Sequence, residues 1–567
     1  MDRNFILAFL LSSFVIFFYY GVFPPDPVKK PAKAIVKNID ASSDVQNTKT
    51  EATQTKEATL QNPSPITVET IATPVVTIET PLYSLTIDTL EGVAKSFYLK
   101  KYHYAGPDHI NAKDWVKSIF SGDLPTKHGI DPNRLVNMIG DVAPGLAPWQ
   151  INLKKDSTEP ISYQASQSSL NVESGARSLT LIGTTKSGMI IQKELIFHSD
   201  SYVVEMEVFI TNKSGTTQII EPKIHFGAGN EMVKTESYPH PKEAAWSFEG
   251  ATEWVDAGDL EDPLEIPIPK WAAVTSAYFV QGVMSKGEQE FKLAITPVAS
   301  TFRGDETLVP HLYYADATRE LQNGSNYNRN FKVYMGPKQT AELEKMDMSF
   351  PAAIYIGWLE IIGHPILALL RWLQSLVHNW GIAIIILTIL VRSAMFPLAF
   401  KGMKGMKKMA QLNPRMKQIK DKYKNNKEKL NLEIMNLYKK NNINPMAGCL
   451  PLLLQVPIFI ALYQALLPAI ELRHQSFFFW VDNLSASDHT LVLPVLMGIS
   501  MYVQQHLTPQ PNMEPMQAKM MKWMPVMLIF FFLDMPMGLV LYWVASNVFT
   551  IFQQLIFNRV QIDEIQH

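Results

Sequence analysis

The spacing of apolar residues divides the chain into two kinds of region. Between residues 81 and 345, short stretches carry an apolar side chain at every second position, as at Val204, Met206 and Val208. A period of two is typical of a strand that buries one face, and turn sequences such as 212–215 separate the stretches. Because no helical pattern lies between them, we predict a large antiparallel β-sandwich over 81–345.

From residue 350 onward, apolar residues form long runs that predict helices. A run of about 20 residues crosses the hydrocarbon of a bilayer. With the amino-terminal run 5–23 included, six runs reach or approach that length: 5–23, 380–400, 450–470, 490–507, 516–533 and 538–557. The fifth reaches it only if Lys519 and Lys522 extend to the interface, and a re-entrant hairpin is the alternative. The stretch 350–378 contains charged residues and proline, which favours an interfacial helix. We therefore predict a mixed membrane protein with a polytopic α-helical core of about six spans and a large sandwich outside the membrane.

The amino-terminal run carries no charge and would be about 28 Å long as a helix. A cleaved signal peptide is the alternative, but Pro-Pro-Asp-Pro follows it instead of the small residues of a cleavage site. We therefore predict an uncleaved anchor over 1–23. Residues 24–80 are rich in Pro, Thr, Lys and Ala with almost no aromatic residues, so we predict a flexible linker there.

Charge is distributed unevenly, although the whole chain has a net charge of −2. Residues 401–440 carry thirteen Lys or Arg and three Asp or Glu, whereas residues 24–345 sum to −9. Basic loops stay on the cytoplasmic side of a membrane, so 401–440 is predicted to be cytoplasmic. The alternation of spans then places both termini in the cytoplasm and the sandwich outside. A single Cys excludes a disulfide framework.

Arg392 is the one charged residue in the run 380–400. It precedes Lys401 by about 13 Å along a helix and so falls within the hydrocarbon. An arginine there costs about 2.5–3.5 kcal/mol and usually faces water or a partner. A side chain that extends to the interface is the alternative, but the distance is long for that, and no predicted span contains an acidic residue to pair with it. We infer a hydrated pocket that opens to the cytoplasm.

Other polar residues share the predicted spans with Arg392. Thr388 precedes Arg392 by one helical turn and so lies on the same helix face. Singly, such residues more often form hydrogen bonds between helices than functional sites. Together with Arg392 they indicate a polar groove for a substrate, whose predicted lining includes Thr388, Gln455, Gln504, Ser546 and Asn547.

The basic stretch 401–440 has apolar residues at helical spacing on both sides of the polar turn 424–427, which predicts a helical hairpin. Its simplest role is to fix the topology of the chain. Its charge also suits contact with ribosomal RNA or anionic lipid, and charge alone does not choose between them. The residues selected for that contact are Lys404, Lys407, Lys408, Arg415, Lys417, Lys420 and Lys422.

Motifs typical of nucleotide-hydrolysing and zinc enzymes are missing from the sequence. There is no phosphate-binding loop, no His-Glu-x-x-His and no pair of cysteines. The predicted spans contain no constellation of His, Asp and Glu. We therefore expect no enzyme activity, no cofactor, no metal site and no DNA partner.

Several stretches together resemble the YidC/Oxa1/Alb3 membrane protein insertase family in its long Gram-negative form. They are 389–392 with 395–398, then 444–451 continuing to 457–463, and 538–543 with Ser546 and Asn547. The resemblance covers the layout of the whole chain and is strongest over 350–557. It implies five core spans within 379–557 around a hydrophilic groove, an additional first span, and a periplasmic sandwich of mutarotase-like architecture.

The same resemblance implies partners and residue roles. Arg392 would lie in the groove, and Thr388 and Trp543 would line the substrate path, although relatives often carry Tyr at the position of Trp543. Nascent membrane proteins would be inserted into the bacterial inner membrane, alone or beside the Sec translocon. Long forms often end in a basic tail, whereas 558–567 holds one Arg and two acidic residues, so any ribosome contact would rest on 401–440.

We therefore predict an insertase and chaperone for nascent membrane proteins. A channel or transporter would also hold an intramembrane arginine and would pass solute across vesicles. A membrane-tethered carbohydrate-binding domain would also suit a mutarotase-like sandwich, but a fold alone does not give a function. Deletion of most of 81–345 discriminates, because an insertase that works through the groove would keep its activity.

Overall fold

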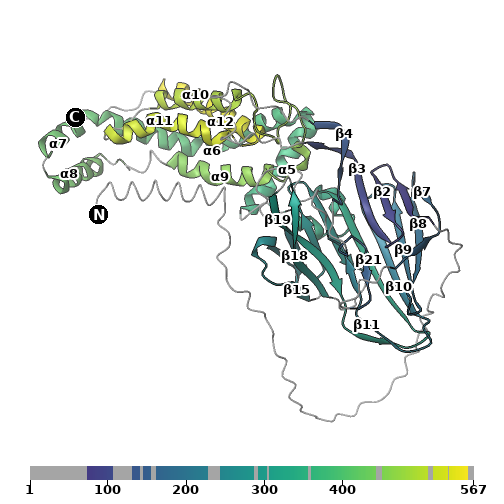
Figure 1. Ribbon diagram of the computed structural model, residues 1–567. Coiled ribbons are helices and arrows are strands. Elements are labelled where there is room, and N and C mark those ends of the chain that lie inside the picture. The colour runs from purple at the N-terminus through teal and green to yellow at the C-terminus, as the bar shows by residue number, and fades with distance from the viewer. Residues whose placement is uncertain are drawn as a thin grey trace, which may run out of the picture.

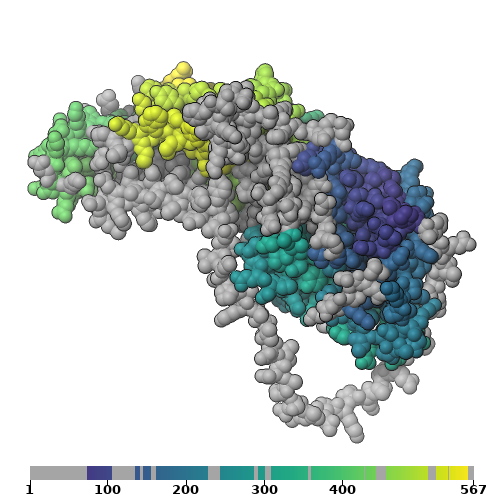
Figure 2. Space-filling view, in the orientation of Figure 1, coloured from purple at the N-terminus to yellow at the C-terminus, as the bar shows by residue number. Residues whose placement is uncertain are grey.

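The computed structural model describes residues 73–105, 130–140, 145–154, 161–227, 243–267, 269–286, 292–302, 305–354, 359–424, 426–441, 443, 450–508, 515–533 and 535–559. All the long sheets lie at one end of the molecule, and the apolar helices extend away from them (Figure 1). The basic residues 413–440 form a lobe at the other end (Figure 2). We call the two ends of the helical region the sheet end and the hairpin end.

The β region contains three sheets of five, nine and five strands and a two-stranded ribbon. Their orders are β4-β3-β2-β1-β7, β14-β13-β16-β17-β21-β10-β9-β8-β6, β15-β18-β19-β12-β5 and β11-β20. The strands are β1 Val75–Glu79, β2 Tyr83–Asp88, β3 Val93–Ala105, β4 Ile130–Asn137, β5 Ile151–Asn152, β6 Tyr163–Ala165, β7 Ser169–Asn171, β8 Ala176–Thr184, β9 Met189–His198, β10 Val203–Asn212, β11 Gln218–Ile220, β12 Lys223–His225, β13 Ala244–Phe248, β14 Ala251–Val255, β15 Leu264–Pro267, β16 Trp271–Thr275, β17 Phe279–Ser285, β18 Lys292–Phe302, β19 Asp305–Ala315, β20 Arg319–Leu321 and β21 Asn326–Pro337.

The period of two explains how these strands pack. In β10, Val204, Met206 and Val208 are fully buried, and the glutamates between them are half-buried. Side chains from all three large sheets join one continuous apolar core. Neighbouring strands pair antiparallel in these sheets, except that β1 pairs with β7 in parallel. The predicted large β-sandwich is confirmed.

The sandwich starts earlier and ends later than predicted. Strand β1 lies within 24–80, so the flexible-linker prediction is wrong for residues 75–79. The reason is that β-branched residues at every second position, Val76 and Ile78, are buried against β2 and β7. At the other end, the short helices α4 (Thr340–Leu343) and η2 (Phe350–Ala353) add Leu343 and Phe350 to the same core. The predicted anchor 1–23 lies outside the described residues.

The helices follow the predicted apolar runs with one difference. They are α5 Glu360–Val377, α6 Trp380–Gln411, α7 Asn413–Lys422, α8 Lys427–Lys440, α9 Leu450–Leu466, α10 Val492–Leu507, α11 Pro515–Phe532 and α12 Met537–Asn558, with the short 3-10 helices η1 Ala257–Asp259 and η4 Ile470–Leu472. The predicted boundary at residue 400 is wrong, because α6 continues through the first basic residues to Gln411. Lys and Met make up seven of the eleven residues 401–411 and favour helix, so the helix continues there. The predicted hairpin is α7 and α8.

Two of the described helices, α6 and α12, are long and apolar enough to cross a membrane by length and composition. The predicted spans 450–470, 490–507 and 516–533 are also helices, of 17, 16 and 18 residues. They fall short of that test by length or by composition. The run 5–23 lies outside the described residues.

Polar contacts join the sandwich to the sheet end of the helices. Arg371 of α5 forms an ion pair with Glu471 at 2.8 Å and donates to the hydroxyl of Thr340 at 3.4 Å. Arg473, just after η4, donates to the backbone oxygen of His103 in β3 at 2.8 Å. These contacts tie α5, the segment after α9 and the sandwich together at one place.

Candidate functional site

The apolar core of the helical region ends one turn before Arg392. On α6, buried residues run from Trp380 to Thr388 and resume at Gly402, and none of 389–401 is buried. On α10, burial likewise stops after Gly498. The helices therefore pack tightly at the sheet end, and their polar residues follow on the side toward the hairpin end.

Arg392 contacts a hydroxyl on the neighbouring helix. Its Nε donates to Oγ of Ser546 in α12 at 2.7 Å, and its Nη2 contacts the same oxygen. Ser546 is buried and Arg392 is half-buried. No Asp or Glu forms an ion pair with Arg392 in the part of the chain that the structure describes. A hydroxyl does not neutralise a guanidinium, so the charge remains for water or an anion.

Tyr542 extends this group of polar residues to α9. Gln455 Nε2 donates to the hydroxyl of Tyr542 at 2.9 Å, and both side chains are buried. The other amide atom of Gln455, Oε1, has no hydrogen-bond partner among the described residues. Tyr542 is not among the predicted groove residues, although its spacing of one helical turn before Ser546 places both on one helix face.

Asn547 makes the corresponding contact with α10. Its Nδ2 donates to Oγ of Ser500 at 2.9 Å, and Gln504 lies half-buried one turn further along α10. We define the polar cluster as Arg392, Gln455, Ser500, Tyr542, Ser546 and Asn547. It draws on α6, α9, α10 and α12 at the point where the apolar core stops.

Three predicted groove residues do not join the polar cluster by any hydrogen bond that the described residues make: Thr388, Gln504 and Trp543. Thr388 is fully buried, and its hydroxyl donates to the backbone oxygen of Ile384 in its own helix at 2.7 Å. The ring of Trp543 packs against Phe459 and Phe532, with centroids 4.7 and 5.1 Å apart. Thr388 and Trp543 therefore border the apolar core.

The basic residues predicted for ribosome or lipid contact lie on two helices. Lys404, Lys407 and Lys408 belong to α6, and the other four, Arg415, Lys417, Lys420 and Lys422, belong to α7. Lys404, Lys417 and Lys422 are exposed. The ammonium of Lys407 lies 5.7 Å from the ring of Phe557, so it also packs on the end of α12. Across the described residues, no three His, Cys, Asp or Glu side chains are grouped to hold a metal.

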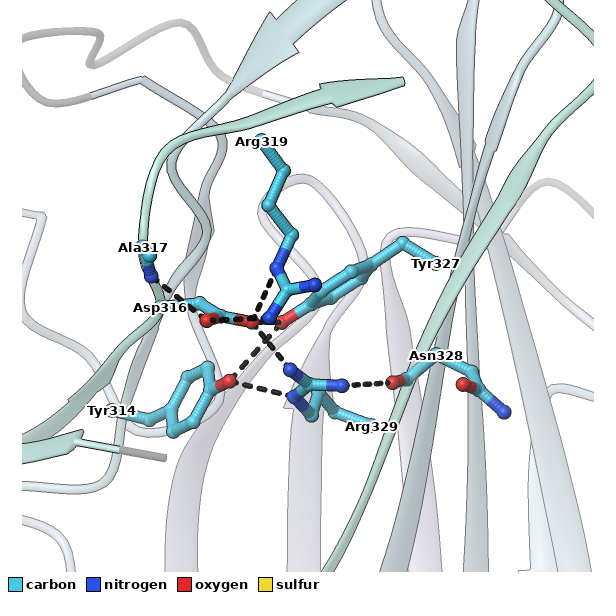
Figure 3. Close-up of polar contacts among 7 residues, drawn as sticks. All are labelled: Tyr314, Asp316, Ala317, Arg319, Tyr327, Asn328 and Arg329. Carbon is cyan, nitrogen blue, oxygen red and sulfur yellow. Dashed lines mark hydrogen bonds and ion pairs between the residues drawn. The ribbon is translucent and has the colours of Figure 1, made fainter. Parts of the chain in front are cut away.

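The sandwich contains a buried arginine of a different kind (Figure 3). Arg329 of β21 donates to Asp316 at 2.6 Å and to the hydroxyl of Tyr314 at 2.7 Å. Tyr327 donates to the same carboxylate at 2.8 Å. Burial raises the pKa of Asp316, but the bond from Tyr327 and the charge of Arg329 outweigh it and leave the pKa below its ordinary value. This group is a satisfied ion pair that ties β19 to β21.

Two histidines are buried side by side between β12 and β19. Nδ1 of His225 lies 2.9 Å from Nε2 of His311, and Asn152 Nδ2 lies 3.2 Å from the other ring nitrogen of His225. Burial lowers the pKa of His225 to about 4 and that of His311 to about 3. Both rings are therefore neutral near pH 7 and link the two strands.

An apolar helical region with an unpaired arginine, joined to a folded sandwich, defines a membrane protein with a large domain outside the bilayer. Two family models match the chain, 60Kd inner membrane protein over residues 372–564 and YidC periplasmic domain over residues 143–369. The membrane protein insertase YidC of Geobacter metallireducens is 31% identical over 99% of this chain and 98% of its own length. That of Syntrophus aciditrophicus is 32% identical over 99% of this chain and 100% of its own length.

The chain belongs to the YidC family of membrane protein insertases. A solved structure, described as an active YidC insertase with the first transmembrane domain resolved, covers 87% of this chain and is 95% covered itself, at 18% identity and a TM-score of 0.36. The predicted family and the predicted insertase function are confirmed by the relatives. This inner-membrane family has a periplasmic domain, acts on nascent membrane proteins and is not a class of enzymes.

Proposed function

We propose that this insertase receives the polar, often acidic, amino-terminal tail of a nascent membrane protein at Arg392. The tail enters from the hairpin end, and the apolar segment of the substrate moves along α9 and α11 into lipid. One observation carries the proposal: Arg392 follows directly on the end of the apolar core and contacts the hydroxyl of Ser546, with no carboxylate partner among the residues that the structure describes. An acidic tail supplies the missing anion.

The two parts of the substrate differ in the free energy of their transfer into the bilayer. Transfer of a helix of about 20 apolar residues into lipid is favourable at roughly 25 cal/mol per Å² of buried surface. The opposing term is the polar tail, because a charged residue at the centre of a bilayer costs about 2.5–3.5 kcal/mol on insertion scales. Water and a guanidinium in the polar cluster replace part of the lost hydration. The site therefore lowers the barrier without any chemical step.

The proposed membrane arrangement has six spans. They are the run 5–23 and helices α6, α9, α10, α11 and α12, with α5 at the periplasmic interface. The net charge of residues 401–440 favours a cytoplasmic hairpin end, with both termini cytoplasmic and the sandwich periplasmic. Thr388, Gln504 and Trp543 then border the groove whose centre is the polar cluster.

Two partners belong to the same proposal. The exposed lysines of α6 and α7, with Lys404 and Lys417 among them, suit ribosomal RNA or anionic lipid at the cytoplasmic face. The Sec translocon would act together with this insertase on nascent membrane proteins that require both. Salt tests the first contact, since binding through phosphate charges weakens steeply as the salt concentration rises.

An insertion assay with reconstituted full-length protein tests the central step. The substrates are one protein with an acidic tail and the same protein with its tail Asp changed to Asn. Arg392→Ala should reduce insertion of the acidic substrate about tenfold, equivalent to ~1.4 kcal/mol, and Arg392→Lys should keep most of it. The difference between the two variants should shrink for the Asn tail.

The matched control is Arg177→Ala, because Arg177 is an exposed arginine of β8 far in the sequence from the helices. It should leave insertion of both substrates unchanged. Equal activity of Arg392→Lys and Arg392→Ala on the acidic substrate would contradict a role for the charge.

A further inference from the structure

The connection between η4 and α10 displays aromatic side chains to the outside. Residues 475–481 carry no charge and include Phe477, Phe478, Phe479 and Trp480 in succession. Phe478 is 49% exposed and Phe479 is 95% exposed, the latter nearly as open as in an extended chain. Large apolar side chains gathered on a surface mark a contact with a partner or a membrane.

We call residues 475–481 the aromatic tip. Hydrogen bonds and ring contacts hold the tip in a fixed shape. The backbone nitrogen of Phe477 donates to Val481 at 2.8 Å, and that of Val481 donates to Phe478 at 3.2 Å. The rings of Phe477 and Phe478 lie 4.6 Å apart, and those of Phe479 and Trp480 lie 6.0 Å apart. Phe479 has a φ of 58°, in the left-handed region that aromatic residues rarely adopt. Such strain persists where the surroundings require it, often at functional positions.

Contacts place the connection that carries the tip level with the start of both long apolar helices. A β-carbon at Gly381, in the first turn of α6, would lie 2.1 Å from the ring of Phe477, so this ring packs directly on that turn. The backbone nitrogens of Met537 and Gly538, at the start of α12, donate to Ala486 and Leu484 of the same connection. In Figure 1 the connection lies where the helices meet the sheets.

Helix α5 adds a second apolar surface at this level. It ends at Val377, just before α6 begins, and its last turns expose Trp372 and Leu376 while Leu370 and Leu373 are buried. A bilayer crossed by α6 and α12 therefore has its boundary at the tip and at the end of α5. Trp and Tyr are enriched at that boundary, and Trp, Phe and Leu form the faces of interfacial segments that are buried among the acyl chains.

We propose that Phe478 and Phe479 enter the periplasmic leaflet of the bilayer and anchor the connection between α9 and α10 in lipid. The partner is the lipid surface, because the tip is uncharged, purely apolar at its exposed end and aligned with the ends of two membrane-crossing helices. This anchor rests on the proposed membrane placement and is independent of Arg392.

Fluorescence quenching in vesicles tests the anchor. The full-length protein with Cys449→Ser receives an environment-sensitive probe at Phe479→Cys and is reconstituted into phosphatidylcholine–phosphatidylglycerol vesicles. Brominated lipids should quench this probe at least threefold more than the same probe at Ile219→Cys. Ile219 is 58% exposed on β11, at the end of the sandwich away from the helices.

Equal quenching at the two positions would overturn the proposal. So would a probe at 479 that stays unquenched by lipid but changes its emission with protein concentration, which would indicate a second copy of the chain as the partner. The insertion assay with Arg392 variants is unaffected by either result, so failure of the anchor and failure of the proposed function are distinguishable.

Discussion

Two arginines lie inside this protein in different surroundings. Arg329 in the sandwich is 7% exposed and is paired with Asp316 at 2.6 Å. Arg392 in the helical region reaches only the hydroxyl of Ser546 and, within the described chain, pairs with no carboxylate. A buried cation that is paired with a carboxylate is needed to neutralise it and has little attraction left for a guest, whereas an unpaired one keeps that attraction. Arg329 therefore serves the structure of the sandwich, whereas we propose that Arg392 serves a substrate.

The largest expected effect comes from breaking the structural pair. Arg329→Met leaves the carboxylate of Asp316 buried with a weaker set of partners, which should cost about 3–5 kcal/mol of the free energy of unfolding. Hydrogen exchange of β19 and β21 in the detergent-solubilised full chain measures this loss. Arg392→Met should change exchange in α6 and α12 little, because it leaves no carboxylate behind.

The double variant Arg329→Met with Asp316→Leu is the control for the first prediction. It removes both charges, so it should recover most of the lost protection. If the double variant is as unstable as Arg329→Met alone, the buried carboxylate left without its arginine is not the cause of the loss.

Acid should weaken the sandwich next most strongly. His225 and His311 have pKa values lowered to about 4 and about 3, below the value of about 6.5 in an unfolded chain. Between these values the unfolded state binds more protons, so stability falls as pH decreases from 6.5 to 4. The loss should be about 3 kcal/mol for each histidine, seen as faster hydrogen exchange in β12 and β19. His311→Gln should flatten this pH dependence, and an unchanged slope would contradict it.

A third prediction concerns a variant that gives Arg392 a carboxylate partner, as Asp316 is for Arg329. Ser546→Asp places a carboxylate on the residue that Arg392 already contacts at 2.7 Å. We expect the fold to be kept and insertion of acidic-tailed substrates to fall about tenfold, equivalent to ~1.4 kcal/mol. Ser546→Asn, of similar size and without charge, is the matched control and should retain activity. Equal insertion by both variants would show that pairing of the cation does not matter.

Much of this architecture follows from local patterns in the sequence. The period of two over 204–210 predicts β10. The alternation of apolar and polar residues is local, so the buried positions can be identified from neighbouring residues in the sequence alone. Arg392 is predictable because a charge in a long apolar run is rare. β1 was missed, because four β-branched residues in a Pro- and Thr-rich stretch become a strand only through pairing with β2 and β7.

The contacts within the site could not be predicted in the same way. The bond between Gln455 and Tyr542 joins residues 87 apart in sequence, and no local pattern indicates that their helices meet. Thr388 shares a helix face with Arg392, yet its hydroxyl is used by its own helix backbone. The sequence gives the polarity of a span, and the packing of four helices decides which polar groups meet.

The proposed function requires that the site around Arg392 is hydrated. Labelling of thiols on α10 tests directly whether water reaches the polar cluster. In a Cys449→Ser background, Ser500→Cys and Met497→Cys place thiols one turn apart on α10, the first in the polar cluster and the second in the fully buried apolar core. A membrane-impermeant maleimide is added to vesicles that expose the cytoplasmic face. We expect rapid labelling at 500 and protection at 497; equal protection at both positions would contradict a hydrated site around Arg392.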